Sequence, residues 1–169
     1  MDLRATILQE HSKAQCRKIV HWVADAQQRF DELFQLFLQD EYRVVQRAAW
    51  PLSICVENHP QLFSDKFDAL IKKMKEPAVH PSVKRNGLRL LLFVTIPKKQ
   101  HGTLMDFSFN MLEDPKEPVA VKVFALYLLG KFAKGYPEII PEIKLFLDDL
   151  EDQSAGLRSC AGKLRAGFK

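Results

Sequence analysis

The side chains that most often do chemistry are present in this chain, but their spacing forms no recognisable ligand set. A helix binds zinc through two histidines four residues apart, and cysteines ligate in C-x-x-C pairs. Neither pattern occurs among the histidines and cysteines, which are His11, His21, His59, His80, His101, Cys16, Cys55 and Cys160. The G-x-S-x-G, H-E-x-x-H and P-loop motifs are also missing from the sequence. We therefore expect no catalytic residue, no cofactor, no metal site and no enzymatic activity.

One acidic run has the residue types of a divalent-cation site. It is "DDLED", which contains Asp148, Asp149, Glu151 and Asp152. The run lacks the glycine and the ligand spacing of a calcium loop. The sequence therefore favours a solvated turn over a cation site.

Arginines recur at helical spacing and suggest a surface for an anionic partner. Arg43 and Arg47 are four residues apart, as are Arg85 and Arg89. Residues 72–101 hold eight Lys/Arg against one acid. A basic strip of this kind would bind phosphates or an acidic segment. The candidate contacts are Arg43, Arg47, Lys72, Lys73, Arg85 and Arg89. The alternative is that these cations pair with nearby acids, such as Asp40 and Glu41, and cover apolar ridges with their stems.

The elements that must position these residues are helices. Apolar residues recur at i, i+3, i+4 and i+7 in four stripes, within residues 30–38, 63–74, 104–112 and 139–150. The stripes end at Leu38, Met74, Leu112 and Leu150, a period of about 38 residues. Each stripe predicts an amphipathic helix with one buried side.

More uniformly apolar helices are predicted between the stripes. Val45, Val83, Val121 and Leu157 occupy equivalent positions in them and recur with nearly the same period as the stripes. Four residues after each of them comes a small residue, namely Ala49, Gly87, Ala125 and Ala161. Two landmarks with one period predict a solenoid of helix pairs. We call the more uniformly apolar helix of each pair its first helix and the amphipathic one its second helix. In such a stack neighbouring units bury each first helix, and small residues let helices approach closely.

The same period applies to the arginines, because Arg47 precedes Arg85 by one full period. The two residues should therefore be neighbours across stacked units, and the four arginines should share one side of the stack. Pro51 lies inside one of the apolar helices and is expected to kink it.

The predicted fold class is therefore all-α, an α-α superhelix of about four stacked antiparallel helix pairs plus a terminal half repeat. The chain of 169 residues is expected to form one domain. Its units are predicted at about 12–38, 40–75, 78–113, 116–151 and 153–167. With no signal peptide, no apolar run near the ~20 residues of a membrane span and an odd number of cysteines, a cytoplasmic location is expected.

The segment "LEDPKEPVAVKVFALYLLGKFA" resembles the HEAT repeat, whose pattern is L-x-D-P, a short gap, V-R, and then spaced alanine and leucine. "LQDEYRVVQRAAWPLSICV" is similar, and the resemblance covers about residues 12–167. It implies an armadillo-type fold and a non-enzymatic scaffold that presents a curved surface, lined by second helices, to a protein partner.

The alternative function is nucleic-acid binding. HEAT-like DNA alkylation-repair glycosylases share this architecture and carry aromatic residues with a catalytic aspartate. The nearby aromatic–acid pairs in this chain are Trp22 with Asp25 and Trp50 with Glu57. Trp50 occupies a core position of its repeat, which favours packing. Self-association through a terminal unit is a third reading, and the oligomeric state stays open.

Overall fold

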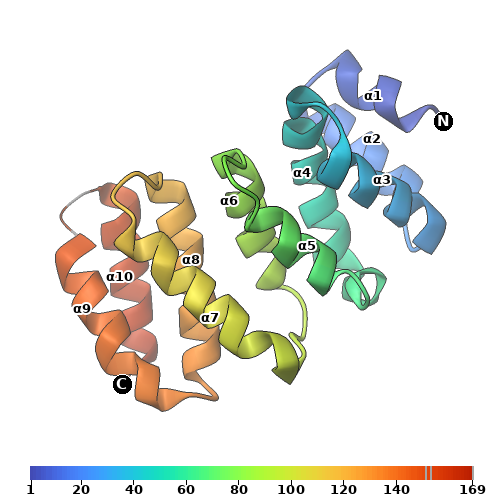
Figure 1. The fold of residues 1–169 in the computed structure, drawn as a ribbon. Helices are drawn as coiled ribbons and strands as arrows, with labels where there is room; N and C mark the ends of the chain where they lie inside the picture. Colours follow the sequence, from blue (N-terminus) through green and yellow to red (C-terminus); the bar gives the residue numbers. More distant parts are fainter. Residues whose placement is uncertain (151, 153, 169) are drawn as a thin grey trace. The chain divides into compact units, whose positions relative to one another are not determined.

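The computed structural model describes residues 1–150, 152 and 154–168, and in that part of the chain every regular element is helical. The all-α prediction is confirmed. The helices divide into two compact units, Met1–Thr95 and Ile96–Lys169 (Figure 1).

The first unit contains six α-helices and one 3₁₀-helix. Their bounds are α1 Leu3–Gln9, α2 Lys13–Val23, α3 Gln27–Gln39, α4 Tyr42–Asn58, η1 Pro60–Phe63, α5 Phe67–Met74 and α6 Pro81–Leu91. Helix α4 is central, because it packs against α1, α2, α3 and α6. Figure 1 shows α4 with α2 on one side and α6 on the other. First helices therefore lie side by side in this unit, as the period predicts.

The second unit repeats this arrangement with fewer helices. It contains α7 Lys98–Glu113, α8 Val119–Ala133, η2 Pro137–Ile139, α9 Ile140–Leu150 and α10 Ala155–Gly167. Helix α8 packs against α7, α9 and α10. This burial explains a helix with almost no polar side: Leu126, Leu128 and Leu129 point in different directions around α8 and are all 0% exposed.

The apolar stripes of the amphipathic helices supply the core side chains that pack against the first helices. Phe30, Phe34, Phe37 and Phe63 lie among the largest fully buried side chains. One stripe differs from the prediction, because the helix expected over residues 63–74 is interrupted. Phe63 ends the 3₁₀-helix and α5 begins only at Phe67. The intervening Ser64 and Asp65 favour turns, and the rings of Phe63 and Phe67 still meet edge to face at 5.0 Å.

The small residues predicted for close helix approach are all buried, at Ala49, Gly87, Ala125 and Ala161. Helix α4 runs continuously through Pro51. Proline has no N–H to donate to the Arg47 carbonyl.

Candidate anion-binding surface

The six cations predicted from the sequence lie on three helices of the first unit. Arg43 and Arg47 are on α4, Arg85 and Arg89 are on α6, and Lys72 and Lys73 are on α5. Helices α4 and α6 are packed neighbours. The two arginine pairs therefore share a pair of first helices, whereas the two lysines lie on a second helix.

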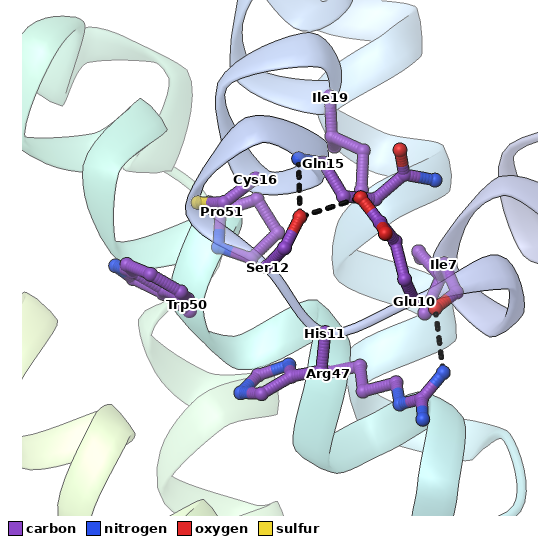
Figure 2. A pocket seen from close by; sticks show the side chains of 10 residues that line it. All are labelled: Ile7, Glu10, His11, Ser12, Gln15, Cys16, Ile19, Arg47, Trp50 and Pro51. Carbon is purple, nitrogen blue, oxygen red and sulfur yellow. Dashed lines mark hydrogen bonds between the residues drawn. The ribbon is translucent and has the colours of Figure 1, made fainter.

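Arg47 is held by the end of another helix. Its Nη1 donates to the Leu8 carbonyl at 2.8 Å and to the Ile7 carbonyl at 3.4 Å. Figure 2 shows the guanidinium reaching from α4 to this backbone. Carbonyls in the last turn of a helix have no partner within the helix, so half-buried Arg47 caps the C-terminus of α1. Its capping bonds commit part of its guanidinium to the fold.

The acids expected to neutralise Arg43 and Arg47 are bound elsewhere. Arg4 of α1 donates from Nε to Asp40 Oδ2 at 2.8 Å, and its Nη2 lies 3.5 Å from Glu41 Oε1. The hydrogen bond from Arg4 lowers the pKa of the Asp40 carboxyl. Arg43 is exposed. The sequence alternative of local pairing thus applies to Arg4, a residue that the sequence pattern did not single out.

Arg89 and Lys73 have specific surroundings, whereas Arg85 and Lys72 are simply exposed. Half-buried Arg89 acts across helices, because its charge opposes the effect of burial on the Cys16 thiol of α2. Lys73 Nζ forms an ion pair with Glu76 Oε2 at 2.8 Å. The charge of Arg89 therefore acts on another first helix, whereas the charge of Lys73 is partly neutralised by an acid three residues later.

The fold adds cations that the sequence pattern did not single out. Helix α2 carries Lys13, Arg17, Lys18 and His21, all exposed, and no acidic residue. It packs beside α4. The signal was available in "KAQCRKIVHWV", which has three Lys/Arg and no acid. The apolar stripes begin only at residue 30, so the periodic pattern did not cover this segment.

Charge is sharply concentrated on the three first helices of this unit. Helices α2, α4 and α6 hold eight of the 14 Lys/Arg in residues 1–95 but one of the 11 acids, Glu57. Second helix α3 instead holds one arginine and two acids. We call the exposed and half-buried side chains of α2, α4 and α6 the basic face. Its Lys/Arg are Lys13, Arg17, Lys18, Arg43, Arg47, Lys84, Arg85 and Arg89.

One small cavity in this unit gathers residue types that resemble a nucleophilic site. It is lined by Glu10, His11, Ser12 and Cys16, among others, and measures about 10 Å³, which is room for one water molecule (Figure 2). Burial raises the pKa of the Cys16 thiol to about 11, so the thiol is protonated near neutral pH and is a poor nucleophile. Ser12 accepts a hydrogen bond from the Gln15 N–H and caps the N-terminus of α2. These side chains connect and cap the helices where the chain is interrupted between α1 and α2.

A model of the HEAT repeat domain matches residues 3–166. The chain belongs to the HEAT repeat family. No curated protein and no solved structure matches it. HEAT repeat domains generally act as scaffolds for protein interactions. In the described part of this HEAT domain, no helix has the length and hydropathy of a membrane span. No group of three His, Cys, Asp or Glu side chains among the same residues is placed to hold a metal ion. Glu151 of the acidic run lies outside the described residues.

The tryptophans of the HEAT domain pack against cationic or aromatic neighbours. The Arg29 guanidinium lies 5.1 Å from the Trp22 ring centroid, and the His11 and Trp50 rings are 5.8 Å apart. Both indoles are half-buried. The core position expected for Trp50 is wrong, because its side chain is half-buried, but its ring still packs against His11.

Proposed function

We propose that this HEAT repeat domain is a non-enzymatic binding module that docks an acidic segment of a partner protein on its basic face. The observation that carries the proposal is the concentration of eight Lys/Arg, against Glu57 alone, on α2, α4 and α6. Solubility requires polar residues on an exposed stripe, but it does not require one sign of charge. Like charges on neighbouring helices repel one another, and an anionic partner removes that cost.

Five of the eight cations are arginines, whose planar forks bind carboxylates in a bidentate manner. The candidate contacts among the predicted residues are Arg43, Arg85 and Arg89. Arg47 contributes charge while it caps α1, and Lys72 and Lys73 lie outside the basic face on α5.

Nucleic-acid binding is the second candidate, because the same cations would also contact phosphates. It predicts a steep fall of affinity with salt, set by the number of phosphates neutralised. On α2, α4 and α6, all of whose residues the structure describes, Trp22 and Trp50 are half-buried, and the exposed Tyr42 packs on the His80 ring at 4.5 Å, so no row of free aromatic rings is available for base stacking. This observation favours the acidic protein segment.

The test compares two double variants of equal charge. Arg43→Ala with Arg85→Ala removes two exposed cations from the basic face, and Lys134→Ala with Lys144→Ala removes two exposed cations from the second unit. Binding of a fluorescent Glu/Asp-rich peptide is measured by anisotropy at low salt. We expect the first variant to lose affinity by about tenfold or more, at roughly 1 kcal/mol for each arginine, and the control to lose little.

Equal losses in both variants would refute a localised docking surface. If a short DNA duplex binds more tightly than the peptide and depends on the same two arginines, the nucleic-acid function replaces the protein-binding one. Circular dichroism of each variant verifies that the fold is unchanged.

A further inference from the structure

The basic face contains an open cavity of about 400 Å³ between the C-terminal halves of α2 and α4. Residues 17–24 form one wall and residues 54–59 form the other, so the two helices run in the same direction here. The lining residues are Arg17, Val20, His21, Ala24, Ile54, Asn58 and His59. All of them belong to the first unit. The cavity is thus part of one compact body and adjoins the cations of α2.

The lining divides into an apolar part and a hydrogen-bonding part. Val20, Ala24 and Ile54 supply the apolar part. The polar part consists of a guanidinium, two imidazoles and an amide, and none of the seven lining side chains is acidic. Arg17 and His21 are one helical turn apart and so share a side of α2. The polar groups all offer N–H donors, and the arginine is always charged.

This donor set exceeds what one carboxylate uses. A carboxylate has two oxygens, and a single arginine fork contacts both of them and leaves one lone-pair site on each. A phosphoryl group has three terminal oxygens and a charge of about −1.5 to −2 at neutral pH, so it accepts from the arginine and from further donors together. The apolar part of the cavity suits the short aliphatic stem of a phosphorylated serine or threonine.

The negative ends of α2 and α4 point toward the cavity and would weaken anion binding. At the end of α2, however, the carbonyls already accept hydrogen bonds. Ala26 N–H donates to the Val23 carbonyl at 3.0 Å, and Arg29 Nη1 donates to the Trp22 carbonyl at 2.7 Å. At the end of α4, Leu62 N–H donates to the His59 carbonyl at 3.1 Å. These bonds reduce the opposing dipoles, and Arg17 lies more than a turn from the end of α2.

Exposure of the cavity decides whether its ligand is free or tethered. Arg17, His21 and Asn58 are exposed, so a small free anion would stay largely hydrated and gain little. A group carried by a segment that already contacts the basic face enters at a high effective concentration. The tethered group is therefore the better occupant.

We propose that this cavity receives a phosphorylated serine or threonine of the acidic segment that docks on the basic face. The inference rests on the proposed function, and it adds a regulated anchor to the charge-based docking. Arg17 holds the phosphoryl oxygens through its fork, and His21, His59 and Asn58 donate the remaining hydrogen bonds.

The experiment uses three acidic peptides that differ only at a central serine and its neighbour. The first carries serine, the second phosphoserine, and the third replaces the serine and its neighbour with two aspartates to match the added charge. We expect the phosphoserine peptide to bind the full-length chain about tenfold more tightly than the two-aspartate peptide, because one phosphoryl group accepts from the Arg17 fork and from the neighbouring donors together. Arg17→Ala should abolish that preference.

Lys18→Ala is the matched control, because Lys18 is the next residue on α2, is exposed, and does not line the cavity. It should weaken all three peptides equally and keep the preference. Arg17→Lys keeps the charge and should still lose most of the preference. Circular dichroism shows whether each variant is folded.

Two failures are distinguishable. If the three peptides bind with equal affinity, or if Arg17→Ala and Lys18→Ala behave alike, the phosphoryl site is wrong while docking on the basic face stands. If no acidic peptide binds, the proposed function fails and the inference falls with it. Displacement of the phosphoserine preference by millimolar inorganic phosphate alone would overturn the tethered form and indicate a free phosphate ligand.

Discussion

Two glycines on first helices should respond to alanine in opposite directions. Gly87 of α6 is buried against α5. A Cβ there would overlap Met74 Sδ and would lie 3.1 Å from Met74 Cγ and 3.2 Å from Leu70 Cδ1. Both neighbours are fully buried, Met74 at 1% exposure and Leu70 at 0%. The methyl group therefore has no free space.

The magnitude follows from two opposing terms. Replacing glycine by alanine inside a helix favours the helix by about 0.8–1 kcal/mol. Overpacking a filled core costs about 1–3 kcal/mol. For Gly87→Ala the second term prevails, and we expect a net loss of about 1 kcal/mol in the free energy of unfolding.

Gly130 of α8 supplies the control. A Cβ there would meet Leu164 of α10, mainly at its Cδ2 end, with Cγ at 3.8 Å. Leu164 is only half-buried, so its side chain has room to turn away. Helix propensity should prevail, and Gly130→Ala should stabilise by roughly 0.5 kcal/mol.

Urea unfolding measures both variants. Trp22 and Trp50 lie in the first unit, so their fluorescence reports on the unit that holds Gly87, whereas far-UV circular dichroism follows Gly130 as well. On a Met74→Ala background, Gly87→Ala should become stabilising, with a coupling of about 1–2 kcal/mol. If Gly87→Ala stabilises the wild-type chain as Gly130→Ala does, the close approach of α5 and α6 is not what requires glycine.

Two further predictions test the helix cap and the buried thiols. Arg47→Ala should destabilise the first unit by about 1–2 kcal/mol, since it frees two backbone carbonyls, whereas Arg43→Ala should change stability by less than about 0.5 kcal/mol in the same urea assay. Equal effects would contradict the capping role. Burial raises the pKa of each cysteine thiol above its value of about 8.5 in the unfolded chain. The thiols therefore favour the folded state at pH values below about 8.5, and this contribution is lost as the pH rises through their pKa values in the folded state. The urea concentration at the unfolding midpoint should therefore decrease as the pH is raised from about 8.5 to about 11, and it should decrease less in a variant with all three cysteines replaced by alanine. The pKa values in the folded state are about 11 for Cys16, about 12 for Cys55 and about 11 for Cys160.

The period of the sequence predicted which residues face a helix neighbour, because burial of a repeated position follows from stacking alone. This is why the small residues at Ala49, Gly87, Ala125 and Ala161 are all buried. The period does not choose among hydrogen-bond partners. Arg47 shares a stripe with Arg43, yet it binds carbonyls at the end of α1, far earlier in the chain. That contact depends on where α1 ends.

The start of the chain was harder to interpret because its first helix is broken. Ile7 of α1 precedes Val45 by one full period. The interruption between α1 and α2 precedes Lys13, which in turn lies one full period before Pro51. We infer that α1 and α2 together form the first helix of the first helix pair, whose predicted range of 12–38 then extends toward residue 3, where the family match begins. The same break interrupts the helical periodicity, so the pattern did not assign the cations of α2 to a helix surface.

The distribution of charge indicates which layer of this HEAT domain would contact the proposed acidic partner. The resemblance to HEAT proteins implied a surface lined by second helices, but in the first unit α3 is mixed in charge and α5 adds only one net cation. The first helices have the narrower exposed stripe, since α4 is buried by four other helices. A narrow stripe that is filled almost entirely with one sign of charge maximises the field per unit of exposed area, and a cavity within that stripe concentrates the field further. The first helices, which the fold buries most, thus leave exposed the stripe of surface that is best suited to bind an anionic group.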